Sequence, residues 1–250
     1  MRLPGEEDSL TTVYRTTVLL LLIAGSLMSQ APINTIPSWD GVLFAAHLGV
    51  PNTATIGQTI TIGPGSAVVS SFAFEIGCNA TEIEAGHCYG PVNLRGEIYA
   101  WDGTKATGPS LFESPLMNLA FSSSYNLVTF NTGALTLPPG NYVIFASTSR
   151  DQVVGISPLS KSLFGALPDT TAYPGGINVY LNNGADTSQW TSVAWVQFPW
   201  DAAFQVNMAP APPPTPTAGV PAASPATLLL GFAGVIALGL LGLSRLRTAR

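Results

Sequence analysis

Charged residues are scarce in this sequence of 250 residues, which carries a net charge of −5. Only 9% of the positions are Asp, Glu, Lys or Arg, compared with about 25% in an average soluble protein. The nine Lys and Arg residues are scattered and form no patch that would bind nucleic-acid phosphates. Hydrophobic residues occupy 46% of the positions, which excludes an acidic disordered protein. The composition therefore predicts one or two folded domains and no nucleic-acid partner.

Residues with catalytic chemistry are also scarce. The chain has two histidines, His47 and His87, and it lacks both a Gly-x-Ser-x-Gly motif and a phosphate-binding glycine loop. A pair of carboxylates could support glycoside hydrolysis, but we interpret Glu75, Glu97 and Asp102 as strand-face and turn residues. The sequence thus predicts no catalytic residue and no enzymatic activity, and a glycoside hydrolase is kept as a third hypothesis.

Residues 18–28 form a largely apolar run of eleven residues near the N-terminus. Such a run is too short to span a hydrocarbon core of ~30 Å as a helix, but it is typical of a secretory signal peptide. Residues 29–31 offer a small-x-small cleavage site, and residues 24–26 offer an alternative. We predict a signal peptide helix over residues 1–31, with an uncleaved anchor or a later start near Val13 as alternatives.

A second apolar segment covers residues 226–243, where Thr227 is the only polar residue. Its length as a helix is about 27 Å, which is enough for a single transmembrane helix. A basic tail at residues 244–250 follows, and the positive-inside rule places it in the cytoplasm. The residues that stop the helix are Arg245, Arg247 and Arg250. Residues 209–225 contain seven prolines and predict an extended stalk.

A short proline motif precedes the apolar segment and consists of Val220, Pro221, Ala222, Ala223, Ser224 and Pro225. The motif, the apolar helix that follows it and the cluster of arginines together resemble the PEP-CTERM sorting signal of bacterial exosortase substrates. The glutamate of that family's Val-Pro-Glu-Pro motif is replaced here by Ala222 or by Ser224. The resemblance implies attachment to the membrane through the C-terminal helix and a sorting or processing protease as partner. It implies no activity.

Period-two apolar patterns dominate residues 40–208, and no long stretch has a helical period. Turn signals separate the patterns at residues 102–103, 131–133, 138–141 and 182–184. Strands are expected at residues 42–47, 55–62, 67–76, 92–101, 125–130, 142–148, 152–156, 177–181, 192–198 and 202–208. About ten short strands predict an all-β ectodomain over residues 32–208, an antiparallel β-sandwich or barrel.

Four strand and turn sequences stand out in this ectodomain: QTITIG at residues 58–63, EIYAWDG at 97–103, GPSL at 108–111 and LPPGNY at 137–142. Together they resemble a recurring domain of anchored bacterial surface proteins. The resemblance implies a jelly-roll-like sandwich of unassigned function.

The two cysteines, Cys78 and Cys88, lie in one loop between expected strands. In a secreted protein such a pair is expected to form a disulfide. A metal site made of Cys78, His87 and Cys88 is the alternative, but it lacks a fourth ligand and the usual zinc spacing. We predict no other metal site and no cofactor, with one exception. The oxygens of Asn182, Asn183, Asp186 and Ser188 could bind Ca²⁺, and the competing interpretation of this segment is a hairpin turn.

Aromatic residues concentrate toward the end of the ectodomain. Exposed rings there could stack on sugar rings, and the residues concerned are Trp190, Trp195, Trp200 and Tyr180. Packing in the core is the competing interpretation. The sequence as a whole predicts a secreted protein of the bacterial cell envelope or surface, held by its C-terminal helix, with a structural or matrix-associated role. The alternative function is binding of extracellular polysaccharide.

Overall fold

The computed structural model describes residues 30–49, 53–88, 90–151 and 161–210. Nearly all of the expected signal peptide, the strand expected at residues 152–156, the sorting motif, the apolar segment and the basic tail lie outside these residues. Within the described ranges, no helix has the length and apolar character needed to cross a membrane. By internal contacts the chain divides into Met1–Ala211 and Pro212–Arg250, and every described residue belongs to the first unit.

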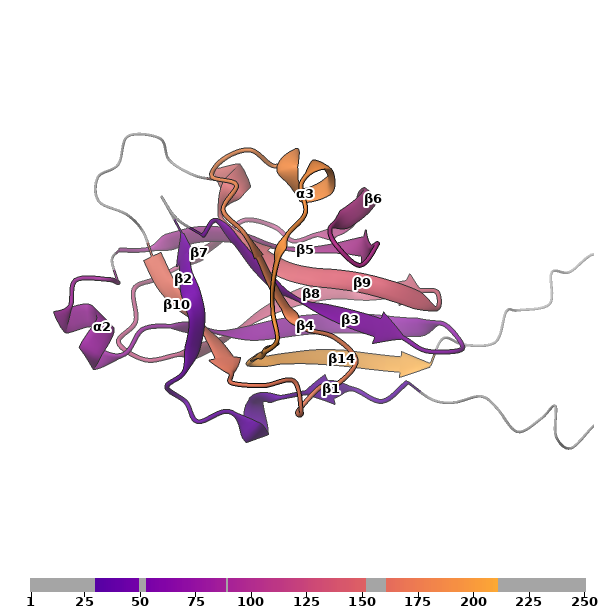
Figure 1. Ribbon diagram of the computed structural model, residues 1–250, viewed down its shortest axis with the longest axis horizontal. Helices are drawn as coiled ribbons and strands as arrows, with labels where there is room; N and C mark the ends of the chain where they lie inside the picture. The colour runs from indigo at the N-terminus through magenta and orange to yellow at the C-terminus, as the bar shows by residue number, and fades with distance from the viewer. Residues whose placement is uncertain (1–29, 50–52, 89, 152–160, 211–250) are drawn as a thin grey trace, which may run out of the picture. The chain divides into compact units, whose positions relative to one another are not determined.

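The described residues form two antiparallel sheets of seven strands each (Figure 1). The first sheet has the order β1 (Ile33–Asn34), β14 (Phe204–Pro210), β4 (Ala67–Gly77), β10 (Lys161–Leu167), β13 (Asp201–Ala202), with β2 (Phe44–Gly49) on β10 and β8 (Asn126–Leu137) on β4. The second has the order β12 (Val196–Phe198), β11 (Asn178–Leu181), β3 (Thr55–Ile62), β9 (Gly140–Ser147), β5 (Val92–Trp101), β6 (Ala106–Glu113), with β7 (Met117–Leu119) on β5. The predicted all-β antiparallel sandwich is confirmed.

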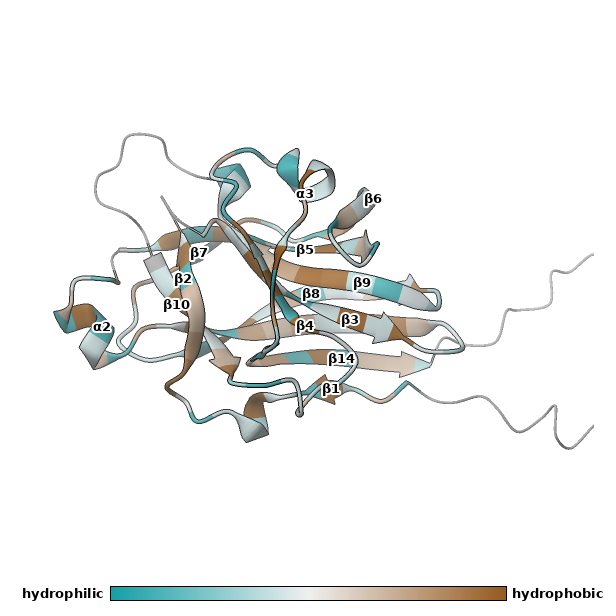
Figure 2. Cartoon of the chain, in the orientation of Figure 1, coloured by the Kyte–Doolittle hydropathy of each residue, from teal (hydrophilic) through white to brown (hydrophobic). Residues whose placement is uncertain are grey.

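The main core lies between the two sheets and follows from the alternation of side chains along each strand. Brown, apolar segments mark the central strands in Figure 2, and the buried rings Phe72 and Phe130 stack at 5.0 Å between centroids. Gly96 of β5 faces this core, where a Cβ would lie 2.3 Å from the Phe130 ring. The two sheets therefore approach so closely at this point that no side chain fits.

A second, smaller core covers part of the outer face of the second sheet. Tyr99 and Phe145 point outward from β5 and β9, and the segment that contains α3 (Gln189–Ser192) places Trp190 and Trp195 over them. Because this segment covers the sheet, residues on both faces of β5 and β9 are buried. The outer face thus carries apolar side chains where an exposed sheet would carry polar ones.

At two places, an expected turn or strand is replaced by a different element. A turn was expected at residues 131–133, but β8 continues to Leu137 through a bulge in which Gly133 and Ala134 have φ angles of 66° and 69°. A strand was expected at residues 192–198, but α3 occupies its start and only Val196–Phe198 pair in β12. At β8, pairing with β4 overrides the local turn signal of the glycine. At residues 192–195, the end of α3 and the segment after it replace the first part of the expected strand.

Candidate functional site

The outer face of the second sheet carries three features in a row along β5. The outward side chains of this strand are Arg95, Glu97, Tyr99 and Trp101, alternating with Leu94 and Ile98 as the sequence predicted. Arg95 and Glu97 belong to an ionic network, Tyr99 to the second core, and Trp101 to a pocket.

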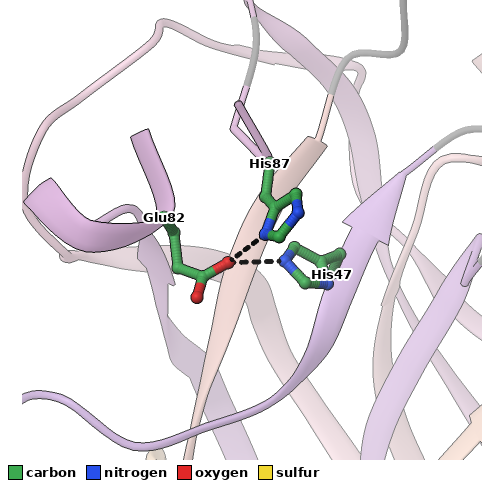
Figure 3. Close-up of side chains that lie close together, drawn as sticks. All are labelled: His47, Glu82 and His87. Atoms are coloured by element: carbon green, nitrogen blue, oxygen red, sulfur yellow. Dashed lines mark hydrogen bonds and ion pairs between the residues drawn. The ribbon is translucent and has the colours of Figure 1, made fainter. Parts of the chain in front are cut away.

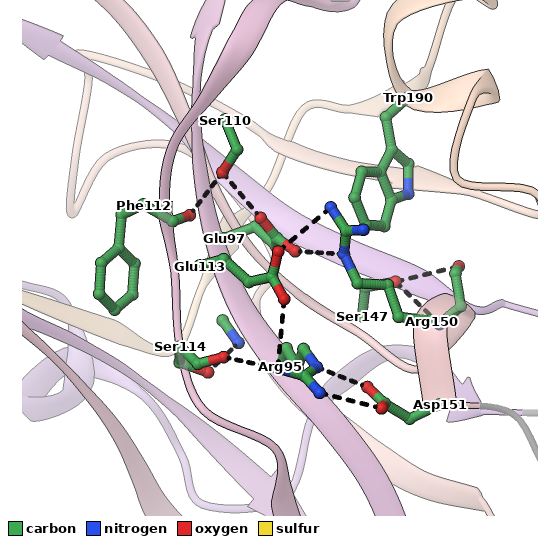
Figure 4. A network of polar contacts seen from close by, with 12 residues as sticks. Arg95, Glu97, Ser110, Phe112, Glu113, Ser114, Ser147, Arg150, Asp151 and Trp190 are labelled. Carbon is green, nitrogen blue, oxygen red and sulfur yellow. Dashed lines mark hydrogen bonds and ion pairs between the residues drawn. The ribbon is translucent and has the colours of Figure 1, made fainter.

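The ionic network joins two arginines to three carboxylates (Figure 4). Arg95 donates to Asp151 at 2.8 and 3.2 Å and lies 3.2 Å from Glu113. Arg150 donates to Glu97 at 2.9 Å and lies 3.4 Å from Glu113. The network therefore ties β5 and β6 to η2 (Ser149–Asp151), which follows β9.

Glu97 is the buried centre of this network, with no exposed surface. Burial raises the pKa of its carboxyl, although the hydrogen bonds from Arg150 and Ser110 oppose the shift. The Arg150 guanidinium also lies over the Trp190 ring, 5.0 Å from its centroid. The Glu97 and Glu113 carboxylates are thus bridged by arginine, as in a structural ion-pair network. Glu97 lies on a strand face, as predicted.

A pocket of about 330 Å³ opens at the other end of β5. Its lining combines the Trp101 ring with hydroxyl and amide side chains and glycine-rich backbone, namely Thr59, Ile60, Thr61, Gly103, Asn141, Pro174, Gly175, Gly176, Ile177 and Gln197. Hydrogen bonds hold two of the polar groups in place: Thr61 donates to Gly175 O at 2.9 Å, and Gln197 donates to Gly103 O at 2.8 Å. An aromatic ring beside fixed hydroxyls and amides is suited to a neutral polar ligand.

The aromatic residues singled out in the sequence lie in two different environments. Trp190 and Trp195 have only 1% and 4% of their surface exposed, so they pack in the second core and are not available for stacking on sugars. Tyr180 and Trp200 are partly buried, and each stacks with Phe198, at centroid distances of 5.1 and 5.6 Å. The ring that lines a pocket, Trp101, was not among the predicted residues.

The loop considered for Ca²⁺ uses its oxygens within the protein. Asn183 is buried; its side chain accepts a hydrogen bond from Thr55 and donates to Ser149. Asp186 accepts hydrogen bonds from the backbone and hydroxyl of Ser188. Gly184, with φ 51°, forms the turn. The competing interpretation as a turn therefore describes this segment.

Cys78 and Cys88 form a disulfide across the predicted loop, with their Cα atoms 6.4 Å apart. The predicted disulfide is confirmed, and it removes both sulfurs from the alternative metal site. Within the closed loop, Asn79 caps α2 (Ala80–Glu84) by accepting a hydrogen bond from the Glu82 N–H at 2.9 Å. This capping arrangement fixes the position of Glu82 in the first turn of the helix.

The disulfide loop and β2 bring both histidines of the chain to one carboxylate (Figure 3). Glu82 Oε2 lies 3.1 Å from His47 Nε2 and 2.8 Å from His87 Nδ1. The hydrogen bonds with His47 and then His87 lower the pKa of the Glu82 carboxyl. The three atoms lie within 4.8 Å of one another, and this is the group of potential metal ligands found among the described residues.

Both histidines are visible in the sequence, but their contact with Glu82 is not. His47 and Glu82 are 35 residues apart, and no motif spacing links them. The available signals were the rarity of histidine in the chain and the Asn-x-x-Glu capping pattern at Asn79. Neither signal shows which strand the loop contacts.

Comparisons with known proteins give one distant structural likeness. No protein-family model and no curated protein matches the chain. The chain is similar to part of the crystal structure of the cysteine protease and lectin-like domains of Cwp84, a surface layer associated protein of Clostridium difficile. The TM-score is 0.39 at 12% identity, and the match covers 64% of this chain and 33% of that one. The chain thus spans about a third of the length of that structure, and the likeness assigns neither a family nor a function.

Proposed function

We propose that this protein is a non-catalytic module of the bacterial cell envelope or surface, exported from the cytoplasm and held by its C-terminal helix. The observation that carries the proposal is the Cys78–Cys88 disulfide, because disulfides form and persist in oxidising compartments. The expected signal peptide and the resemblance to a sorting signal point the same way. We also propose that the sandwich is of the jelly-roll-like type.

Mass spectrometry of the native protein tests both export and sorting. The mature N-terminus is expected within or shortly after residues 24–31, and alkylation without reductant is expected to leave Cys78 and Cys88 unmodified. Removal of the arginine tail would support processing by a sorting protease. Recovery of surface material that still contains Arg250 would exclude cleavage, and recovery of reduced thiols from the cytosol would exclude export.

Binding of extracellular polysaccharide is the second candidate function, and the pocket beside Trp101 favours it. Its aromatic ring can stack on a sugar while the amides of Asn141 and Gln197 bind hydroxyls. On a glycan array, the full-length chain should bind a neutral polysaccharide, and Trp101→Ala should abolish this binding. Trp200→Ala is the matched control, because Trp200 stacks on Phe198 outside the pocket lining.

The outcomes separate the two functions. If no glycan on the array binds, the structural or matrix-associated function remains. If Trp200→Ala abolishes binding and Trp101→Ala does not, the sugar binds at the stack of Tyr180, Phe198 and Trp200 and not in the pocket. Release of reducing sugar during incubation with a polysaccharide would contradict the non-catalytic proposal and would support the third hypothesis, a glycoside hydrolase.

A further inference from the structure

We propose that His47, Glu82 and His87 bind one divalent transition-metal ion, for which Zn²⁺ is the probe, between the disulfide loop and strand β2. This site is separate from the Trp101 pocket and from the ionic network. The inference goes beyond the proposed envelope function, and it rests on the geometry of three side chains from two parts of the chain (Figure 3).

The donor set selects the class of metal. Two imidazole nitrogens and one carboxylate oxygen are ligands of Zn²⁺ and of neighbouring transition-metal ions. Ca²⁺ and Mg²⁺ require mostly oxygen ligands, and Glu82 supplies the only carboxylate of the group. A Zn²⁺ site of this composition has three protein ligands and keeps a fourth position for water or an external ligand.

Two of the three separations between ligand atoms are close to those around such an ion, and the third, between the two imidazole nitrogens, is within 4.8 Å. Bonds of about 2.0–2.1 Å in a tetrahedral site place neighbouring ligand atoms roughly 3.3 Å apart. The observed separations from Glu82 Oε2 are 3.1 Å to His47 Nε2 and 2.8 Å to His87 Nδ1. Movements of a few tenths of an ångström therefore suffice for these two pairs. In the metal-bound form, each neutral ring carries its proton on the other nitrogen, so His47 is protonated at Nδ1 and His87 at Nε2.

The surrounding structure holds two of the ligands in position before metal binds. The backbone N–H of His87 donates to Glu82 O at 2.8 Å, so these residues are joined through both backbone and side chain. The disulfide closes the loop that contains them. His47 comes from β2, which pairs with β10 along five positions. Preorganisation of this kind reduces the ordering that binding would otherwise require.

The site is accessible to an ion from solvent. The His87 side chain is 54% exposed, and those of His47 and Glu82 are 28% and 17% exposed. A bound ion would link the disulfide loop to the first sheet and present its open position outward. The ion would thus stabilise the contact between α2 and β2, and it could accept an oxygen or nitrogen ligand from outside.

Zinc titration of the full-length chain, purified in mild detergent without a histidine tag and treated with chelator, tests the proposal. A competing chromophoric chelator should report one bound Zn²⁺ per chain with micromolar or tighter affinity. His87→Gln and Glu82→Gln should each weaken binding by more than about tenfold, since both remove a direct ligand. Glu84→Gln is the matched control: it removes one exposed carboxylate from the same helix and should leave the affinity unchanged.

A second measurement covers the case in which a variant fails to fold. X-ray absorption at the zinc edge of the wild-type protein should show two imidazole ligands and only nitrogen and oxygen neighbours. No saturable binding, equal affinity in His87→Gln, equal loss in Glu84→Gln, or equally tight binding of Ca²⁺ would each overturn the proposal. Sulfur neighbours at the zinc edge would also overturn it, because they would place the ion at reduced cysteines.

Discussion

Asp201 gives the stability of this protein a pH dependence opposite to that of an ordinary salt-bridged carboxylate. The residue lies in β13 with no exposed surface, and its carboxyl accepts hydrogen bonds from Gln58 at 3.1 Å and from the Tyr173 N–H at 2.8 Å. No ion pair to Asp201 occurs among the side chains that the structure describes. Burial therefore outweighs the two hydrogen bonds and raises the pKa from 3.8 to about 6.

The sign of the effect follows from where the proton binds more tightly. Since the folded state has the higher pKa at Asp201, it holds the proton between about pH 4 and pH 6, where the unfolded chain has lost it. The contribution of this residue to stability is therefore full below pH 4 and is lost as the pH rises through 6. A pKa shift from 3.8 to about 6 corresponds to a contribution of about 3 kcal/mol to the free energy of unfolding. About 2–3 kcal/mol of this contribution is lost between pH 4 and pH 7.5.

Urea unfolding of the wild type and of Asp201→Asn, followed by tryptophan fluorescence from pH 4 to 7.5, measures this contribution. The substitution also alters one hydrogen bond, but that cost does not depend on pH and appears as a constant offset. The free energy of unfolding of the wild type relative to Asp201→Asn should fall by about 2–3 kcal/mol as the pH rises.

Asp186→Asn is the control for this experiment. Hydrogen bonds from Ser188 and Gln189 lower the pKa of the exposed Asp186 carboxyl below 3.8, so its contribution is lost only below that pH. The stability of the wild type relative to this variant should therefore stay nearly constant from pH 4 to 7.5. A pH-independent difference between the wild type and Asp201→Asn would show that the Asp201 carboxyl is solvated, and it would refute the reasoning.

Three further variants test the rest of the sandwich by denaturant unfolding. Replacing Cys78 and Cys88 by serine should lower the free energy of unfolding by about 3 kcal/mol, since the bridge closes a loop with a sequence separation of 10; an unchanged midpoint would contradict this. Gly96→Ala should cost about 1–3 kcal/mol or more, because the added methyl group meets an aromatic ring of the facing sheet; a neutral result would mean that the sheets separate easily. Arg150→Met should cost about 3–5 kcal/mol by leaving the buried Glu97 without its partner, and retention of wild-type stability would show that water replaces the guanidinium.

Much of the sheet structure could be predicted from the sequence. The strands expected at residues 55–62 and 92–101 coincide with β3 and β5, and the turn at Asp102-Gly103 separates β5 from β6. Alternation and turn chemistry are local properties, so a window of ten residues contains them. The prediction was less successful where composition was ambiguous, as at β6 and β10, which were not expected.

The candidate sites depended on contacts that no local pattern contains. The indole of Trp190 was expected either in the core or on a sugar-binding face, and the packing of its own segment on Tyr99 and Phe145, both distant in sequence, decided for the core. Asp201 lies just before the strand expected at residues 202–208, and no local pattern indicates that it is buried beside Gln58, 143 residues away.

An antiparallel β-sandwich or barrel and the pairing of the two cysteines could be predicted from the sequence, because both depend on short-range spacing. The contact of His47 with Glu82 in the disulfide loop and the place of Trp101 in the pocket lining are visible only in the folded chain. The physical reason is that alternation assigns a residue to one face of its own strand, whereas the partner opposite that face comes from whichever distant segment the packed sheets bring there.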